Sequence, residues 1–510
     1  MFGSNQKIPD LTGVRNTCNG YDSRSHQWEI VRDCVEGSDR IKEKAELYLP
    51  MANYKKNEEG RRRYEAYKQR AVYVNFIGQS LEIMHGMIFR RTPTIKAPDE
   101  FKNSGLLSNV DRKGSSIYQF SSDSTYDVMQ TGFGGYLVDM PSAPVGISVQ
   151  EAEEAGIKPY IKYYKAEDVR FWKFTEVKGV EKLTLVILRE YQDVSENEFS
   201  HDIHECFRVL ALDENGNYYQ RFYTPLYDRD KKVYNYTVKN IDVYVQGEHI
   251  QYLPFTLLPY GEPEKPMLYD LAVLNIAHYQ STADYKNGVH MTTIPTGYIT
   301  GHQPKDYGSE NKNDHDDDVT LGGDVMLTEE DPNAKFGVLT FAGEGLSHAE
   351  SDIDKIEAQM AGIFIKDIAP DKKTSETAES AYVHRAGENA KLATFARNMS
   401  IKLTQAVQWF MEWNGYEGVV ELQLNYDYET MSLDPNIINS IANISGQGKF
   451  PLYCVFWILK QQELIEPDMN YDDFIFLIDE EQSSGMTAAE IYEAFKAKRA
   501  SENRMITNVR

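Results

Sequence analysis

Cysteine is scarce in this chain of 510 residues, and the cysteines that occur lie far apart in the sequence. They are Cys18, Cys34, Cys206 and Cys454, and no two of them form a CxxC pair. A disulfide framework needs several cysteines at short, regular spacings. The sequence therefore excludes a small disulfide-stapled fold and favours a reducing compartment.

Long apolar runs are also missing. The longest is the eight-residue run LYCVFWIL around Tyr453, whereas a membrane-spanning helix needs roughly 20 apolar residues. The first residues, MFGSNQKIPDLTG, contain no apolar stretch, which predicts that no signal peptide is present. We expect a protein that does not insert into a membrane.

The sequence lacks the common catalytic motifs. It has no GxxxxGK[ST] phosphate-binding loop, no GxSxG and no HExxH. The GFGG stretch at 132–135 lacks the GxGxxG spacing and precedes an apolar run, so we interpret it as the entry to a strand. The histidines and cysteine of HDIHEC, at His201, His204 and Cys206, have no second cluster that would complete a zinc site, which favours an exposed loop.

Carboxylates gather at Asp314, Asp316, Asp317 and Asp318, which suggests a calcium loop. Such a loop begun at Asp314 needs Gly at its sixth position and Glu at its twelfth, but Val319 and Val325 stand there. A solvated acidic loop is the preferred interpretation, with weak cation binding in an assembled ring of such loops as the alternative. We predict no enzymatic activity, no cofactor and no bound metal.

Positive charge is in deficit: the chain has 54 Lys and Arg against 78 Asp and Glu, a net charge of −24. Residues 301–360 alone have 15 acidic and 4 basic residues, a net of −11, which is nearly half of the excess. Tight DNA binding requires Lys and Arg contacts to phosphates, so this composition argues against a protein that wraps DNA.

The residue patterns that are present predict an α+β fold. Helical spacing predicts helices over residues 25–49, 58–89, 115–130, 267–289, 346–364 and 376–413, the last with a bend at Gly387. Residues 159–254 alternate with period two and are rich in Val, Ile, Tyr and Phe, which predicts an inserted antiparallel β module. Within it, Asn215 and Gly216 favour a type I′ hairpin turn.

Two features flank the turn between the last two predicted helices. Ile353, Ile356, Met360 and Ile363 recur at spacings of 3, 4 and 3, which predicts one apolar stripe on the helix over 346–364. The turn itself contains a paired lysine, Lys372 and Lys373, in an otherwise acidic chain.

Three stretches, in this order, resemble the portal proteins of tailed double-stranded-DNA bacteriophages. They are RRRYEAYKQRAVYVNFIGQSLEIMHGMIFRRTPTI with the residues before it from Ala45, LYDLAVLNIAHYQSTADYKNGVHMTTIPTGYITG from Leu268, and DIDKIEAQMAGIFIKDIAPDKKTSETAESAYVHRAGENAKLATFARNMSIKLTQAVQWF from Asp352. The resemblance covers roughly residues 25–426.

The resemblance implies a place for each element. These are an N-terminal helical wing part at 1–158, a β-rich wing module at 159–265, a first stem helix at 266–290, a clip at 291–345, a second stem helix at 346–364, a tunnel loop at 365–377, a long wing helix and strand at 378–432, and a C-terminal helical crown at 433–510. The clip is longer and more acidic than the family pattern needs, and the crown carries no motif of the family.

The resemblance also implies a function. Portal proteins form rings, usually of twelve subunits, at one capsid vertex of the virion, where double-stranded DNA passes through an axial channel regardless of its sequence. Their partners are the terminase large subunit during packaging, head–tail adaptor and tail proteins afterwards, and the major capsid and scaffold proteins. Assembly in the host cytoplasm and a role in DNA ejection are the corresponding expectations.

The charge distribution is consistent with a conduit. An acidic wall repels the DNA backbone, so DNA can slide without being held. Lys372 and Lys373 are then expected to form one thin basic collar that contacts phosphates, and the four aspartates of 314–318 to take part in terminase or adaptor docking. The stripe Ile353–Ile363 is expected to pack between subunits.

Alternatives remain at this point. The lysines can instead belong to a solvated turn, or they can pair with Asp371 or Glu376. The chain can be another head–tail connector or a minor capsid protein without a DNA channel. A metal-dependent nuclease that uses Asp314–Asp318 is the third hypothesis, for which loss of plasmid cleavage on Asp316→Ala would be needed.

Overall fold

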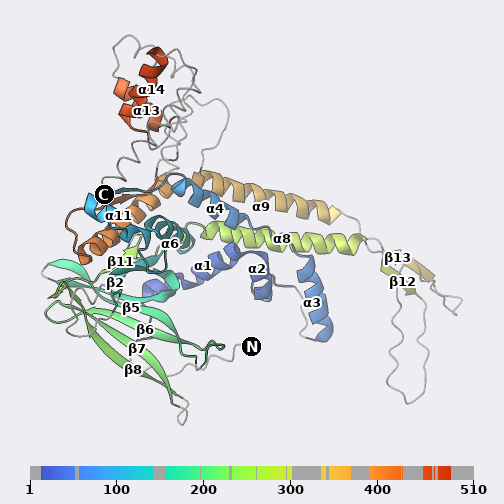
Figure 1. Ribbon diagram of the computed structural model, residues 1–510. Coiled ribbons are helices and arrows are strands. Elements are labelled where there is room, and N and C mark those ends of the chain that lie inside the picture. Colours follow the sequence, from blue (N-terminus) through green and yellow to red (C-terminus); the bar gives the residue numbers. More distant parts are fainter. Residues whose placement is uncertain are drawn as a thin grey trace. The chain divides into compact units, whose positions relative to one another are not determined.

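The structure is a computed structural model that describes residues 13–51, 57–141, 156–177, 179–195, 197–228, 233–259, 261–293, 296–300, 335–339, 344–368, 390–426, 428, 452–461, 465 and 469–483. The chain divides into two compact units, Met1–Tyr426 and Asp427–Arg510. Helices and antiparallel strands occur together in the first unit, which confirms the predicted α+β class (Figure 1).

The N-terminal helical region is broken where the sequence predicted a continuous helix over 25–49. Helix α1 (Asn19–Glu36) ends at Gly37, helix α2 (Ser38–Lys44) follows, and a short 3-10 helix, Ala45–Leu47, completes the region. Gly37 has a φ of 103°, which L side chains rarely adopt, and its N–H caps α1 on the carbonyl of Asp33. The glycine therefore turns the chain inside the predicted helix.

The predicted helix over 58–89 is also two helices, α3 (Glu58–Arg70) and α4 (Phe76–Phe89). The intervening residues, AVYVN, include two β-branched side chains that favour extended backbone. Asn75 then caps α4, because its Oδ1 accepts a hydrogen bond from the N–H of Gly78 at 2.8 Å. In the following part of the chain lie β1 (Thr94–Lys96), α5 (Asp99–Asn103) and α6 (Ile117–Thr131).

The core of the first unit is a three-stranded sheet covered by helices. Its order is β11 (Phe255–Leu258), β2 (Gly134–Asp139) and β3 (Tyr160–Lys165), all antiparallel. Helix α11 (Ala390–Trp413) packs on all three strands through a buried face with helical spacing: Leu392, Phe395, Ala396, Met399, Leu403, Ala406, Val407 and Phe410. Strand β14 (Glu421–Gln423) returns from α11 and pairs with β1.

The GFGG stretch is the entry to strand β2, as predicted. Gly132 ends α6 in the left-handed region, with a φ of 67°, and β2 begins at Gly134. Gly135 packs so closely that an added Cβ would lie 2.1 Å from Cζ of the Phe255 ring. Only glycine fits at this point of the sheet.

We expect Gly135→Ala to destabilise the fold by about 1–3 kcal/mol, because the methyl group overpacks a buried site. Gly86 in α4 is the matched control, since nothing lies within 4 Å of its added Cβ. Gly86→Ala should stabilise the helix by up to about 1 kcal/mol. Urea unfolding of both variants at one protein concentration checks the pair. Equal midpoints for Gly135→Ala and the wild type would show that Phe255 moves aside.

The β module is a five-stranded antiparallel sheet in which each strand pairs with the next. Its strands are β4 (Val169–Val177), β5 (Val180–Asp193), β6 (Ile203–Leu212), β7 (Tyr218–Asp228) and β8 (Val233–Asp242), and two short strands, β9 (Tyr244–Val245) and β10 (Glu248–His249), pair beyond it. The type I′ prediction is wrong: Gly216 has a φ of 84°, but Asn215 is not among the described residues with positive φ. Asp213 instead organises a longer turn, because its Oδ1 accepts from the N–H groups of Asn215 and Asn217.

A buried charge network joins the five-stranded sheet to the three-stranded one. Arg208 on β6 donates to Asp139 on β2 at 2.5 Å and to Glu190 on β5 at 2.9 Å. Gln220 on β7 donates to Asp139 at 2.8 Å, and Lys162 on β3 forms an ion pair with Glu190 at 2.8 Å. The Arg208 and Asp139 side chains are only 10% and 5% exposed, so the two sheets meet around paired charges that water barely reaches.

The second unit contains two described helices, α13 (Leu452–Gln461) and α14 (Tyr471–Ser483). Phe456 and Met469 form its small core, against which Phe474 and Leu477 pack. Asn470 caps α14, since its Oδ1 accepts from the N–H of Asp473 at 2.8 Å. Short helices after residue 433 agree with the sequence-based expectation.

Candidate functional site: the α8–α9 helix pair

The two helices that the resemblance assigns to the stem form an antiparallel pair. They are α8 (Tyr269–Thr293) and α9 (Glu344–Ile368), both slightly longer than predicted, so the first residues of the predicted tunnel loop at 365–377 are still helical. Each has 25 residues, which corresponds to about 37 Å at 1.5 Å per residue. In Figure 1 they run side by side.

Two contacts between α8 and α9 fix the alignment of the pair, and a third joins α9 to α4. Nε2 of His278 in α8 lies 3.0 Å from Oε1 of Glu357 in α9. At one end of the pair, Gly288 in α8 packs closely against Leu346 in α9, since a Cβ added to the glycine would lie 2.8 Å from the leucine side chain. At the other end the ring of Phe364 meets the ring of Phe76 at the start of α4, with centroids 6.0 Å apart.

Burial falls steeply along the pair. In the first part of α8, Leu271, Ala272, Asn275, Tyr279 and Ala283 are almost fully buried. After Ala283 no described residue of α8 is buried, and in α9 the first buried side chain is Met360. The near half of the pair is therefore held in the body of the unit, and the far half extends into solvent.

Polar contacts anchor the near half of α8. The Asn275 side chain donates to the carbonyl of Val74 at 2.9 Å and accepts from the N–H of Ile77 at 3.2 Å. Farther along, Tyr67 in α3 donates to Asp284 at 2.5 Å, and Arg70 donates to Asn287 at 2.9 Å. These contacts fix the direction in which the pair leaves the body.

A two-stranded antiparallel hairpin follows at the far end. Strand β12 (Thr296–Thr300) comes three residues after α8, and β13 (Lys335–Leu339) precedes α9, with Tyr298 opposite Gly337. The predicted clip range, 291–345, thus begins in the last turn of α8, contains both strands, and ends in the first turn of α9. The acidic residues Asp314, Asp316, Asp317 and Asp318 lie outside the described residues.

The other predicted site residues are divided between described and undescribed parts of the chain. Lys372 and Lys373 lie outside the described residues, between α9 and α11. In the apolar stripe, Met360 is buried within its own chain at 2% exposure, whereas Ile353, Ile356 and Ile363 are half-buried. Packing of the stripe against a neighbouring subunit stays a prediction for these three isoleucines.

The described residues bring no metal-binding group together. Among them no set of three His, Cys, Asp or Glu side chains could hold a metal ion. His201 lies 3.0 Å from Asp193, and His204 lies 3.2 Å from Asp202, while Cys206 is buried. His204 and Cys206 belong to strand β6, so only His201 fits the predicted exposed loop.

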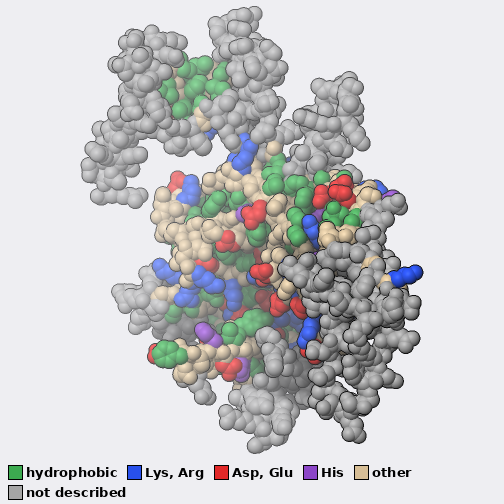
Figure 2. All heavy atoms as spheres, turned by 90° about the vertical axis from the view of Figure 1, so that its right-hand side faces the viewer, with side chains coloured by type: hydrophobic (Ala, Val, Ile, Leu, Met, Phe, Trp, Pro, Cys, Tyr) green, Lys and Arg blue, Asp and Glu red, His purple; other side chains and the backbone are tan. Residues whose placement is uncertain are grey.

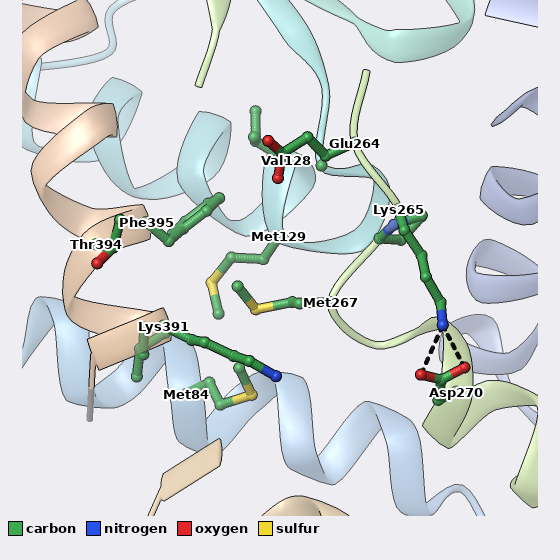
Figure 3. A pocket seen from close by; sticks show the side chains of 13 residues that line it. Met84, Val128, Met129, Glu264, Lys265, Met267, Asp270, Lys391, Thr394 and Phe395 are labelled. Carbon is green, nitrogen blue, oxygen red and sulfur yellow. Dashed lines mark hydrogen bonds and ion pairs between the residues drawn. The ribbon is translucent and has the colours of Figure 1, made fainter. Parts of the chain in front are cut away.

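A cavity of about 500 Å³ lies between α4, α6, α11 and the segment that leads into α8. Figure 3 shows Met84, Met129, Met267 and Phe395 around it, with Lys391 along one side. At its rim Lys265 forms an ion pair with Asp270 at 2.6 Å. Its lining combines apolar side chains with the charged Glu264, Lys265, Asp270 and Lys391, and the methionines are too far apart in sequence to reveal it.

None of the described helices combines the length and the apolar character needed to cross a membrane.

Comparisons with known proteins give limited matches. Residues 267–414, which include α8, α9 and α11, match a family described as a domain of unknown function (DUF4055). No curated protein matches. Among solved structures, a chain of the virion of a native gene transfer agent particle is 11% identical with a TM-score of 0.33, and the match covers 81% of this chain and 96% of that one. A chain from the neck of the empty particle is also 11% identical with a TM-score of 0.32, over 76% and 90% of the two chains. At such scores the matches do not establish a common fold.

Proposed function

We propose that this chain is the portal subunit of a tailed bacteriophage or a related DNA-carrying particle, a structural component of the head–tail junction that forms a ring around a DNA channel. The observation that carries the proposal is the α8–α9 pair, which is anchored at one end, exposed at the other and followed by the β12–β13 hairpin. Because an isolated helix pair with so little buried surface is marginal in water, its far half needs neighbours. Identical pairs arranged around an axis supply them.

The order of the elements along the chain supports the same function. A helical region, a five-stranded β module, a helix, a hairpin, a second helix and a long helix packed on a sheet follow one another as the resemblance implies. The proposed channel carries the net charge of −11 of residues 301–360 once per subunit, and this charge disfavours lasting contact with DNA. Terminase docks on the clip during packaging, and adaptor and tail proteins replace it later.

Electron microscopy of the purified full-length chain tests the proposal. We expect rings with an axial hole wide enough for a DNA duplex, and native mass spectrometry should give one multiple of the subunit mass of 58.5 kDa. A chain that stays monomeric at every concentration, with and without the scaffold protein of its particle, would overturn the proposal. Closed dimers without a hole would favour a minor capsid protein instead.

A further inference from the structure

Two surfaces of opposite charge lie on different sides of α8. Helix α3 has five basic and three acidic residues, a net of +2, and α9 has six acidic and two basic residues, a net of −4. The contacts of α8 with α3, at Asp284 and Asn287, lie about a third of a turn around the helix from its contacts with α9, at His278 and Gly288. Figure 1 accordingly shows α9 on one side of α8 and α3 on the other.

The α3 surface consists of Arg61, Arg62, Val72 and Val74. Both arginines are exposed. Within the described part of the chain, Arg62 pairs only with Glu58, in an ion pair whose side chains are 80% and 82% exposed, and Arg61 has no ion pair. Val72 and Val74, in the extended segment directly after α3, are 46% and 44% exposed. Exposed positive charge thus lies near the start of α3, and uncovered β-branched side chains follow its end.

The α9 surface consists of Glu350, Asp354 and Ile353. The two carboxylates are four residues apart, so they lie on one flank of the helix, and neither has an ion pair among the described residues. Glu357 on the same flank is already engaged by His278. Ile353 lies beside the carboxylates and is half-buried, so this surface combines negative charge with an apolar edge. Figure 2 views the molecule from the side of the far ends of the pair, and acidic side chains lie there next to hydrophobic ones.

We propose that the α3 surface of one copy binds the α9 surface of the next copy, head to tail, around the ring. The proposal rests on the proposed function, since a ring built from one kind of subunit needs two different, complementary patches on each copy. Arg61 and Arg62 supply charges opposite to those of Glu350 and Asp354, which sets the register of the contact. When the two surfaces meet, the apolar side chains of the valines and of Ile353 are removed from water, which favours the contact.

Charge reversal and its compensation test the contact in the full-length protein. We expect Arg61→Glu with Arg62→Glu, and separately Glu350→Lys with Asp354→Lys, to weaken the association constant of assembly on the order of tenfold per interface. The quadruple variant restores the opposite signs and should return assembly to within about threefold of the wild type. Analytical ultracentrifugation over a range of NaCl concentrations measures all three, and the wild type should lose affinity as salt rises.

Lys182→Glu with Lys239→Glu, both exposed on the five-stranded sheet, is the matched control with the same change of charge, and it should assemble as the wild type does. If the wild type forms rings and both reversals form them equally well, the proposed α3–α9 contact is wrong, but the proposed ring function is not contradicted. If the reversals dissociate the ring and the quadruple variant does not recover, the two surfaces do not face each other. If the wild type forms no ring, both the proposed function and the proposed contact between copies are wrong.

Discussion

Replacing Arg208 by methionine is expected to lower the free energy of unfolding by about 3–5 kcal/mol, because it leaves the buried carboxylate of Asp139 without a cation and that of Glu190 with Lys162 alone. Arg208 contacts both Asp139 and Glu190, and its guanidinium also lies 4.1 Å from the centroid of the Phe222 ring. These contacts connect the two sheets of the first unit. Loss of the arginine should therefore separate the sheets before it affects the helices. Chemical denaturation at one protein concentration measures the change, since assembly would otherwise alter the apparent stability.

An exposed ion pair is the matched control for this buried one. Lys96 lies 2.9 Å from Glu421, and the two side chains are 68% and 58% exposed. Lys96→Met should change the free energy of unfolding by less than about 1 kcal/mol. Adding Asp139→Asn and Glu190→Gln to Arg208→Met should recover part of the loss, because the uncompensated charges disappear. If Arg208→Met unfolds at the same denaturant concentration as Lys96→Met, the network does not hold the sheets together.

Glu190 gives the same network a pH dependence. Its burial raises its pKa, but the charges of Arg208 and Lys162 outweigh this and lower the pKa from 4.5 to about 2. A carboxylate whose pKa is lower in the folded state stabilises the fold above its unfolded pKa and loses this contribution as the pH falls. The wild type should therefore lose stability between about pH 5 and pH 2. The Glu190→Gln variant should lose less over the same range, as denaturation at each pH would show.

Local patterns predicted the type of most described elements. The apolar residues of α11 recur at helical spacing from Leu392 to Phe410, because one face of the helix is buried against the rest of the unit. In β5 and β6 the β-branched and aromatic residues identified strands, although consecutive residues are buried there, at 186–188 and 206–211. The breaks within predicted helices were missed. Gly37 and the segment before Asn75 interrupt otherwise regular patterns, and only the tertiary position of the segment shows why. Tyr73 there is buried and donates to the carbonyl of Cys34.

The candidate site was predicted less completely than the fold. Spacing identified the apolar stripe of α9, but nothing in the local sequence indicates that His278 meets Glu357, 79 positions later. The same holds for the Arg208 network, whose members Asp139 and Gln220 are 81 positions apart. Contacts of this kind depend on which strands and helices become neighbours. Sequence periodicity determines which face of an element is buried, but it does not determine that element's partner.

Reversing the charge of the paired lysines is expected to have the largest effect on function. If Lys372 and Lys373 line the channel of a ring, Lys372→Glu with Lys373→Glu replaces a basic collar by an acidic one in every subunit. The chain has a net charge of −24, and residues 301–360 alone contribute −11, so no other positive zone is expected to substitute for the collar. Rings should still assemble. Particles that keep their genome should fall on the order of tenfold, because each lost phosphate contact lowers DNA affinity. Counting filled and empty particles by electron microscopy measures this.

Conservative and distant variants separate a collar from a solvated turn. Lys372→Arg with Lys373→Arg keeps the charge, so it should keep the filled fraction, because a sequence-independent phosphate contact needs a cation and not a particular side chain. Lys182→Glu with Lys239→Glu adds the same negative charge on the exposed β module and should also package normally. If the acidic collar variant retains DNA as the wild type does, the two lysines do not contact DNA and belong to a solvated turn. Loss of DNA in the arginine variant as well would mean that the shape of the segment matters, not its charge.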